Sequence, residues 1–389
     1  MISVAEALDK LLELAAPLAV EEVPLRASSG RTLARPVTAR RDQPPFSASA
    51  MDGYAIAGDA APGDRFEIIG EAAAGHGFSG SVGSGQAVRI FTGAPMPEGA
   101  TRVVIQEDTA RDGGTITLTE DLGTGPHVRA LGADFRIGDT LHAPRLLSPS
   151  DVALMAAMNI DTVPVTRRPD VAIIATGDEL VQPGEDPGPD QIIASNSYGL
   201  AALVEALGAT ARLLPIARDT KASLQTVFDL AEGADLILTI GGASVGDHDL
   251  VGPALADRGM ERAFYKVAMR PGKPLMAGRL GDAALIGLPG NPVSAMVCGH
   301  VFVAPVIRAM LGQKDVVPMP EQRPLVADLP ANGPRQHYLR ARTTAEGVIA
   351  YDKQDSSLLS VLSEADCLIV QPPGDPGQPA GRYVDVLPL

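Results

Sequence analysis

The run Asp-Leu-Ile-Leu-Thr-Ile at residues 235–240 restricts the possible fold more than any other stretch of this chain. It is almost wholly apolar and ends at the paired glycines Gly241 and Gly242. A short apolar run that stops at glycine is typical of a strand buried on both faces. These glycines and Gly246 remove side chains where the backbone turns, so several N–H groups can point at one anion. The stretch therefore predicts a buried strand followed by a phosphate-binding loop.

Candidate strands and helices alternate on both sides of this run. The expected strands cover residues 171–175, 211–217, 235–240, 262–268 and 283–287, and the expected helices cover residues 196–207, 220–232, 248–258 and 292–311. Such alternation predicts a doubly wound parallel sheet covered by helices on both faces. Ligands of these sheets bind beyond the carboxyl ends of the strands.

Charged residues follow the ends of these expected strands. The acids are Asp178, Glu179, Asp219, Asp247 and Asp249, and the bases are Arg218, Lys266, Arg270 and Lys273. The rigid turn Pro289-Gly290-Asn291-Pro292 follows the last strand and opens a helix, where Pro292 suits the first turn. A single acid at a strand end is usually a solvated loop residue or a helix cap. Several on one rim predict a site for a hard cation beside a site for phosphate-like groups.

The chain on either side of this segment has a different character. An amphipathic helix is expected at residues 3–16, with Ser3 and Glu6 as a capping box. A second helix is expected at residues 147–159, capped by Ser148 or Ser150 and with Pro149 in its first turn. Short extended segments are expected at residues 65–70, 87–91, 102–107, 115–119, 338–342, 348–351 and 367–371. Both flanking regions are therefore predicted to be mostly β. Residues 75–80 match G-x-G-x-x-G, but no helix pattern follows, so we interpret them as a hairpin loop.

Composition limits the compartment and the partners. The 389 residues exceed one ordinary core, and the net charge of −15 argues against nucleic acid as a partner. Cys298 and Cys367 are the only cysteines and lack the spacing of a zinc site, which favours a reducing cytoplasm. We expect a cytoplasmic protein with a small-molecule substrate. The N-terminus, Met1 to Glu6, lacks the basic and apolar regions of an export signal, and the longest apolar stretch, residues 296–307, is too short and broken for a membrane span.

Parts of the pattern also bring to mind a serine hydrolase, a P-loop protein and a non-catalytic binding module. Residues 242–246 match the G-x-S-x-G turn of a serine α/β-hydrolase with Ser244 as nucleophile. That reading is disfavoured because His248 lies too close, His300 falls in a helix pattern and His337 lies beyond the sheet segment. Gly272-Lys273 lacks the upstream glycine of a P-loop. A non-catalytic binding or scaffold module stays open.

Six stretches together resemble one family, the molybdopterin molybdenumtransferases or MoeA family, which includes the E domain of gephyrin. They occur in family order across nearly the whole chain, at residues 49–55, 92–97, 176–180, 241–246, 270–274 and 288–294. The resemblance implies an enzyme of molybdenum cofactor biosynthesis. It would insert molybdate into adenylylated molybdopterin and release AMP, with Mg²⁺ present.

The resemblance also implies an elongated homodimer of four-part subunits. The parts are an extended helical N-terminal domain at residues 1–43 with 137–168, an inserted β domain at residues 44–136, a central molybdopterin-binding α/β domain at residues 169–315 and a C-terminal β-barrel at residues 316–389. The family's active site lies between subunits, so the inserted domain of one would face the sheet of the other. A transient contact with the molybdopterin adenylyltransferase is a further expectation.

Site residues follow from the resemblance position by position. It implies catalytic roles for Asp52, Glu179, Asp219, Lys266 and Lys273, and metal binding by Glu179, Asp219 and Asp249. It implies cofactor binding by Thr92, Asp134, Gly241, Gly242, Ser244, Gly246, Arg270, Pro289, Asn291, Pro292, Arg340 and Ser356. The chain departs from the family pattern at Arg270, often Lys, at Asp355, usually Gly, and at Asp366, often Asn.

Overall fold

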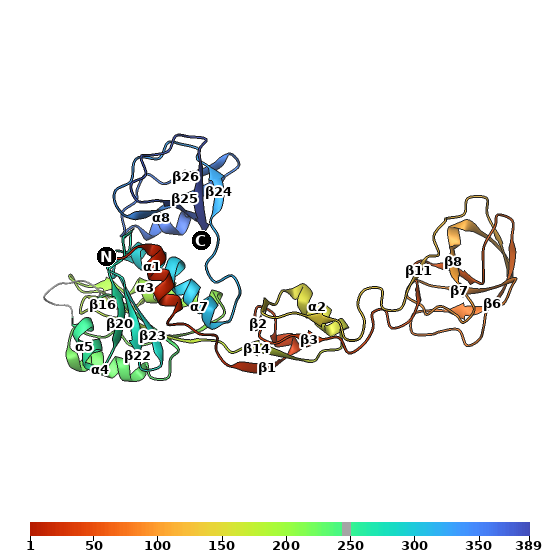
Figure 1. Cartoon of the computed structure of the whole chain (residues 1–389), viewed down its shortest axis with the longest axis horizontal. Coiled ribbons are helices and arrows are strands. Elements are labelled where there is room, and N and C mark those ends of the chain that lie inside the picture. Colours follow the sequence, from red (N-terminus) through yellow and green to blue (C-terminus); the bar gives the residue numbers. More distant parts are fainter. Residues whose placement is uncertain (243–249) are drawn as a thin grey trace.

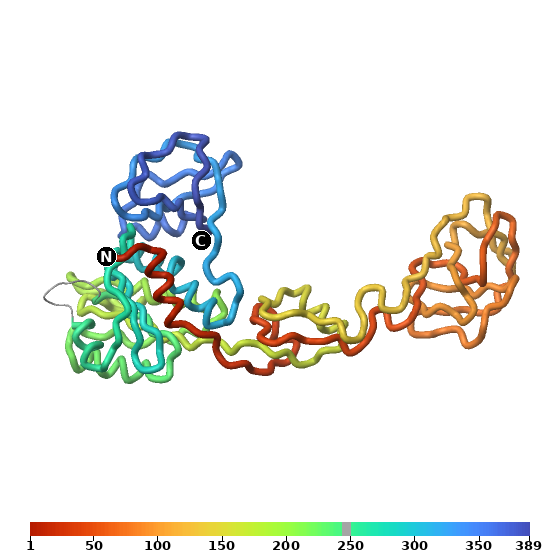
Figure 2. Tube along the Cα trace, viewed as in Figure 1, coloured from red at the N-terminus to blue at the C-terminus, as the bar shows by residue number. Residues whose placement is uncertain are grey.

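The computed structural model describes residues 1–242 and 250–389 as an elongated molecule with a large end and a small end (Figure 1). The large end holds an α/β body, residues 170–310 with the N-terminal helix, and a C-terminal body, residues 321–388. Two extended stretches of chain lead through a middle unit, residues 20–38 and 140–166, to a distal body, residues 48–129 (Figure 2). Both termini lie at the large end.

The α/β body contains a six-stranded sheet of order β18-β15-β19-β23-β22-β20. Its strands are β15 (Asp170–Ala175), β18 (Thr210–Leu213), β19 (Leu236–Ile240), β20 (Glu261–Tyr265), β22 (Met276–Leu280) and β23 (Ala283–Leu288). The four strands β18, β15, β19 and β23 pair in parallel, as predicted. The short ribbon of β16 (Leu180–Val181) and β17 (Ile192–Ile193) lies beside it.

The prediction of a wholly parallel sheet is wrong at one edge. Strand β22 was not expected, and it pairs antiparallel with both β23 and β20. Only Gly281 and Asp282 separate β22 from β23, and a two-residue connection can join antiparallel strands only. Gly281 has a φ of 60°, the left-handed conformation that such turns need. The sheet is therefore mixed.

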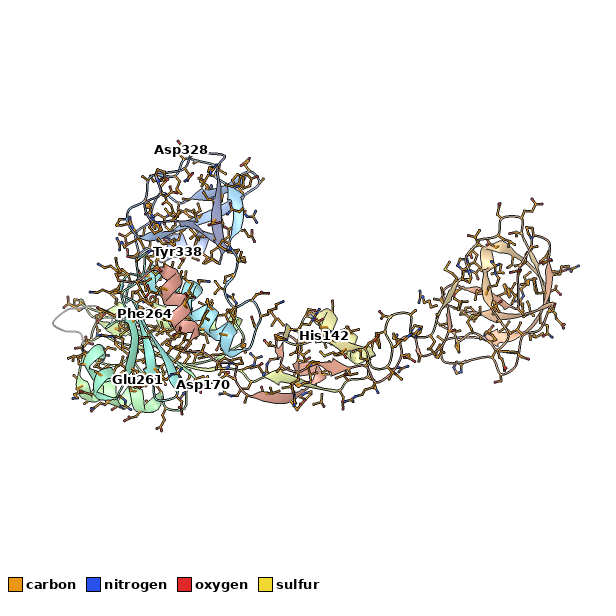
Figure 3. All side chains as sticks on the ribbon, viewed as in Figure 1. His142, Asp170, Glu261, Phe264, Asp328 and Tyr338 are labelled. Carbon is orange, nitrogen blue, oxygen red and sulfur yellow. The ribbon has the colours of Figure 1, made fainter. Side chains whose placement is uncertain are left out.

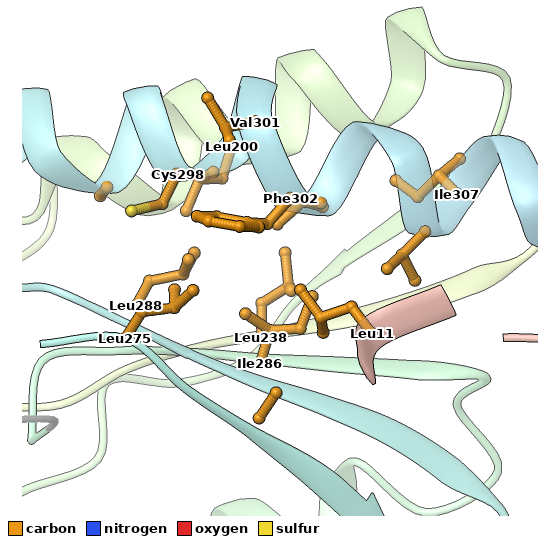
Figure 4. Close-up of a cluster of buried hydrophobic side chains, with 14 of the residues drawn as sticks. Leu11, Leu200, Leu238, Leu275, Ile286, Leu288, Cys298, Val301, Phe302 and Ile307 are labelled. Atoms are coloured by element: carbon orange, nitrogen blue, oxygen red, sulfur yellow. The ribbon is translucent and has the colours of Figure 1, made fainter. Parts of the chain in front are cut away.

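Helices cover both faces of this sheet. One face carries α1 (Val4–Leu12), α3 (Ser195–Ala206), α6 (Pro292–Cys298), the π-helical turn η3 (Gly299–Val303) and α7 (Ala304–Met310), and the other carries α4 (Lys221–Leu230) and α5 (Val251–Asp257). Figure 4 shows the first face, where Phe302 and Leu200 pack onto Leu238 and Ile286 of the sheet. The alternation of buried residues along each strand fixes which helices each face meets.

Residues 292–310 form one continuous helical segment through α6, η3 and α7. In length and composition this helix could cross a membrane, with a mean hydropathy of 1.6, but 78% of that window is buried inside the structure. Its apolar residues, among them Phe302, belong to the core of the α/β body. The segment is a core helix of this body.

The middle unit and the distal body are mostly β, as predicted. The middle unit contains β1 (Val20–Pro24), η1 (Leu25–Ala27), β2 (Thr32–Leu33), β3 (Val37–Thr38), β12 (Thr140–Leu141), β13 (Arg145–Leu146), α2 (Pro149–Ala157) and β14 (Thr162–Thr166). The distal body contains β4 (Ala48–Ser49), β5 (Gly53–Ile56), β6 (Arg65–Ala72), β7 (Gln86–Ile90), β8 (Arg102–Ile105), η2 (Gln106–Asp108), β9 (Thr109–Asp112), β10 (Thr115–Leu118) and β11 (Val128–Arg129). Six of these strands form one sheet of order β8-β5-β7-β6-β10-β9.

The predicted helix starts are confirmed, and one loop prediction is wrong. Ser3 caps α1, and Ser148 caps α2 with Pro149 in its first turn. The G-x-G-x-x-G segment, however, lies in the connection between β6 and β7, which pair in parallel. Parallel strands cannot be joined by a hairpin, so this segment is a crossover connection.

The C-terminal body is a six-stranded sheet packed on the α/β body. It contains β24 (Glu321–Pro324), β25 (Gln336–Thr344), β26 (Gly347–Ala350), α8 (Leu359–Glu364), β27 (Cys367–Gln371) and β28 (Tyr383–Pro388), joined by β21 (Met269–Arg270) from the α/β body. A bridge between Leu325 and Val348 links the β24 end of the sheet to β26. Tyr338 lies on the side that faces the α/β body (Figure 3) and shares its core cluster.

Candidate functional site

One edge of the α/β sheet collects the charged residues that the sequence singled out. The carboxyl ends of β15, β18, β19 and β23 share this edge because those strands are parallel. Strand β20 runs in the same direction, since β22 is antiparallel to both β20 and β23. Asp170 and Glu261, the first residues of β15 and β20, mark the opposite edge (Figure 3). We call the carboxyl edge the rim.

The glycine loop begins at the centre of the rim, directly after β19. Gly241 and Gly242 have φ values of 91° and 63°, which favour glycine. A Cβ at Gly241 would lie 2.9 Å from the carbonyl oxygen of Thr176, and one at Gly242 would lie 2.2 Å from Cγ2 of Val251. Both positions therefore require glycine. The predicted site residues Ser244, Gly246 and Asp249 lie outside the described residues.

Two neighbouring loops carry the predicted acids Glu179 and Asp219, and both residues are exposed. Nη1 of Arg218 donates to the carbonyl oxygens of Gly177, Asp178 and Leu180 at 3.4, 3.0 and 3.0 Å. The Asp219 N–H donates to Oδ1 of Asp178 at 3.1 Å. Arg218 thus ties the two loops together.

The acids of the rim offer oxygen ligands of the kind that hard cations prefer. A Cβ at Gly177 would lie 2.3 Å from the Glu179 carboxylate, so this carboxylate folds back over its own loop. Among residues 1–242 and 250–389, no three His, Cys, Asp or Glu side chains gather closely enough to hold a metal ion. The described residues therefore supply only part of the predicted metal site, whose third ligand is Asp249.

The predicted cations lie at the same rim, between β20 and β22. Lys266 is half-buried and has a φ of 69°, a left-handed conformation that costs an ordinary residue about 1–2 kcal/mol. Its N–H donates to Leu275 O at 2.8 Å, and its Nζ lies 4.8 Å from the centre of the Tyr265 ring. Lys273 and Arg270 are exposed. Backbone strain such as that at Lys266 is common at functional sites.

A second group of cations joins the rim to the C-terminal body. Arg270 pairs with His337 where β21 meets β25. Burial, and after it the charges of Arg270, Arg340 and Arg335, together lower the pKa of His337 to about 4. His337 is therefore neutral at pH 7 within a strongly positive neighbourhood.

The Pro-Gly-Asn-Pro turn is held from two sides. Nδ2 of Asn196, in α3, donates to Gly290 O at 2.7 Å, and Nδ2 of Asn291 donates to Oγ of Ser356 at 3.1 Å. The Val293 N–H also donates to Ser356 O at 3.1 Å. Pro289 is buried, and Pro292 occupies the first turn of α6 as predicted. The turn is thus fixed to both α3 and the C-terminal body.

Arg340 is buried, with 1% of its surface exposed. Its Nε and Nη2 donate to Oε1 of Gln354 at 3.1 and 3.0 Å, and its Nη1 donates to Asp355 O at 2.7 Å. The guanidinium thereby holds the segment that carries Ser356. This geometry fits a residue that positions Ser356 better than one that touches a ligand.

Asp52 and Thr92 form a second site in the distal body. The N–H and Oγ1 of Thr92 donate to Oδ1 of Asp52 at 2.7 and 2.8 Å. The Thr92 N–H, then its hydroxyl, and the charge of Arg89 lower the pKa of Asp52. Asp134 is exposed on the stretch of chain between β11 and β12, which leads from the distal body to the middle unit, and its N–H donates to Gln43 O at 2.9 Å.

One chain does not bring the two groups of predicted residues together. The rim belongs to the α/β body at the large end, whereas Asp52 and Thr92 belong to the distal body at the other end (Figure 1).

Sequence reasoning missed two residues that hold this machinery in place, Asn196 and Arg89. Asn196 lies in the first turn of α3 and supports Gly290, 94 positions away. Arg89 lies in β7 and donates to the carbonyl oxygen of Gly53, next to Asp52. Both side chains donate to main-chain carbonyls that are remote in sequence, and no spacing rule reports such contacts.

A cavity of about 810 Å³ lies at the opposite edge of the sheet, lined in part by Leu14, Asp235, Arg258, Arg279 and Ala283. Asp235 and Ala283 precede or begin their strands, so this cavity faces away from the rim. Ligand sites of such sheets occur at the carboxyl edge, and we therefore place the functional site at the rim despite the size of this cavity.

Three family models match the chain in succession. The MoeA N-terminal region (domain I and II) matches residues 2–159, a probable molybdopterin binding domain matches residues 172–309, and the MoeA C-terminal region (domain IV) matches residues 322–389.

Relatives named molybdopterin molybdenumtransferase align over most of the chain. The relative from Nostoc sp. is 36% identical over 386 residues, covering 95% of this chain and 88% of its own. A relative from Mycobacterium tuberculosis, molybdopterin molybdenumtransferase 2, is 35% identical and covers 94% of each chain.

Solved structures share the whole architecture. Two structures titled molybdopterin biosynthesis MoeA protein, from Pyrococcus horikoshii, superimpose with TM-scores of 0.84 and 0.87 at 28% and 27% identity. Each covers 100% of this chain, and this chain covers 99% and 100% of theirs.

Proposed function

Because the chain belongs to the MoeA family, we propose that it is a molybdopterin molybdenumtransferase of molybdenum cofactor biosynthesis. It inserts molybdate into adenylylated molybdopterin and releases AMP. The observation that carries this proposal is the rim, where Gly241, Gly242 and the cations Lys266 and Lys273 share the carboxyl edge of the sheet. Backbone N–H groups and cations at such an edge bind phosphate-like anions.

The cations of the rim bind the two anionic substrates. Lys266 and Lys273 act as compact charges, and Arg270 offers a planar fork that can contact two oxygens at once. Neutralising phosphate and molybdate oxygens lets the two anions approach each other despite their repulsion. The Pro289–Pro292 turn, held by Asn196 and Ser356, shapes the wall of this site.

Magnesium completes the charge balance in this proposal. Glu179 and Asp219, with Asp249, would hold the ion, which would neutralise the phosphate whose bond to AMP breaks. Carboxylates fit Mg²⁺ by ligand chemistry, and Arg218 keeps the loops of Glu179 and Asp219 together.

The site is completed by a second copy of the chain in a homodimer. Asp52, Thr92 and Asp134 of one subunit would face the rim of the other. Thr92 donates to Oδ1 of Asp52, and the lowered pKa keeps this carboxylate ionised at neutral pH. In this proposal the ionised carboxylate accepts a proton from the reacting groups. We propose that this cytoplasmic dimer receives its substrate from the molybdopterin adenylyltransferase by transient contact.

The test is incubation of the purified protein with adenylylated molybdopterin, molybdate and Mg²⁺, with AMP release and cofactor formation as readouts. Molybdate-dependent AMP release supports the transferase, and its loss with a chelator supports the magnesium site. Tight binding of adenylylated molybdopterin without AMP release would instead identify a non-catalytic scaffold. Turnover that is unchanged by chelation would contradict the metal proposal alone.

A further inference from the structure

Arg89 is a half-buried cation on β7, a central strand of the sheet in the distal body. It lies on β7 directly opposite Tyr54 on β5. The centre of its guanidinium lies 5.1 Å from the centre of the Tyr54 ring and 4.6 Å from that of the Phe91 ring. An arginine held between two aromatic faces is fixed in orientation.

The same guanidinium clamps the main chain around Asp52. Its Nη1 donates to Gly53 O at 2.9 Å, and its Nη2 donates to Oε1 of Gln106 at 2.7 Å. The Gln106 N–H in turn donates to Asp52 O at 3.0 Å. Two consecutive carbonyls, those of Asp52 and Gly53, are therefore held by Arg89 and by the residue that Arg89 contacts.

The end of β7 also supplies Thr92, whose N–H and hydroxyl hold Oδ1 of Asp52. Arg89 thus fixes the backbone of Asp52, and Thr92, three residues later, fixes its side chain. The backbone at Asp52 and Gly53 has no room to move toward β8. The two strands are so close that a Cβ at Gly53 would lie only 2.0 Å from Val104 O. A lysine in place of Arg89 could not donate to both acceptors in one plane.

We infer that Arg89 is a positioning residue for Asp52, which it keeps aimed at the rim of the partner copy. This inference rests on the proposed function of Asp52. Arg89 itself needs no contact with either substrate.

The test compares Arg89→Met, Arg89→Lys and Gln106→Ala with Arg65→Met, a control at an exposed arginine of the same body. For Arg89→Met we expect kcat to fall about 10-fold or more, as for a displaced general base, with the KM for molybdate unchanged. Arg89→Lys should lie between Arg89→Met and wild type, and Gln106→Ala should show a smaller loss of kcat. A raised KM with kcat unchanged would make Arg89 a binding residue and overturn the inference.

Amide hydrogen exchange gives a readout that does not depend on turnover. In Arg89→Met the Gln106 and Thr92 N–H groups should exchange about 10-fold faster, whereas Arg65→Met should leave them unchanged. Unchanged exchange and unchanged kcat would overturn the inference. If Arg89→Met fails to fold, Gln106→Ala decides, because its side chain is exposed at the contact. Absence of AMP release by the wild type would refute the proposed function. The exchange rates of the Gln106 and Thr92 N–H groups would still test whether Arg89 positions Asp52.

Discussion

The Asp52 carboxylate is accessible to solvent and yet fixed in direction. Thr92 engages its Oδ1 twice, and the main chain on either side is clamped by Arg89 and Gln106. This carboxylate is not part of the hydrophobic core of its own body. We propose that its role is catalytic and that it faces the rim of a second copy.

Replacing Asp52 or Lys273 with alanine should therefore remove activity and leave the fold intact. We expect AMP release to fall about 100-fold or more for Asp52→Ala, the usual contribution of a positioned acid or base, and by a similar factor for Lys273→Ala. Unfolding free energies should stay within about 0.5 kcal/mol of wild type. The controls are two exposed positions, Asp59→Ala in the distal body and Lys314→Ala in the segment that follows α7. Loss of folding in either active-site variant would favour a structural role.

His337 should make the C-terminal body sensitive to acid. Its folded pKa of about 4 lies below the ordinary value of 6.5, so the unfolded chain binds a proton first as the pH falls. The contribution of His337 to the free energy of unfolding should be constant above pH 6.5 and should decrease between pH 6.5 and pH 4, by up to about 3 kcal/mol.

Urea unfolding of wild type and His337→Gln at several pH values measures this contribution by difference. The wild type should lose stability over that pH range more steeply than His337→Gln. A variant at the exposed His142 should follow the wild-type curve. Parallel curves for wild type and His337→Gln would show that folding does not lower the pKa of His337.

Sequence spacing identified the residues of the rim because they follow strand ends that share one edge. It could not assign Asn196, Arg89 or the buried state of Arg340. Those depend on contacts such as that of Asn196 with Gly290, which only the folded chain creates.

At the scale of elements, close packing of strands decides where glycine is obligatory. Strand β5 begins at Gly53, where β8 approaches so closely that a Cβ would lie 2.0 Å from Val104 O. The backbone of β8 cannot yield without breaking its pairing with β5. Packing of β5 against β8 therefore requires glycine at position 53.

We expect Gly53→Ala to destabilise the distal body by about 1–3 kcal/mol through this overpacking. Gly114→Ala is a matched control in the same body, since a Cβ there meets nothing within 4 Å. Thermal unfolding followed by circular dichroism compares the two variants with wild type. Equal midpoints for Gly53→Ala and Gly114→Ala would show that β5 and β8 can separate freely.

The helices other than α8 and five of the six strands of the α/β sheet were predictable, because their apolar pattern reflects a buried surface. Strand β22, Met-Ala-Gly-Arg-Leu, lacks β-branched residues and contains a glycine, so its pairing comes from its neighbours in the sheet. Likewise, nothing local shows that β6 and β7 are parallel, which is why a hairpin was expected there. Strand direction is a tertiary property.

At the scale of the whole molecule, the elongated shape separates the two halves of the proposed site. The distal body carries Asp52 and Thr92, and the large end carries the rim (Figure 2). Two copies related by a twofold axis can place each distal body against the other copy's rim and so form two equivalent sites. Activity should then depend on the pair of subunits.

Mixed dimers test this central claim most directly. Asp52→Ala and Lys273→Ala subunits, each inactive alone, are unfolded, mixed in equal amounts and refolded, and molybdate-dependent AMP release is measured. A heterodimer contains one site with both defects and one with neither, so the mixture should recover about a quarter of wild-type activity. Recovery at that level would establish a site shared between subunits. A mixture as inactive as either variant alone would contradict it.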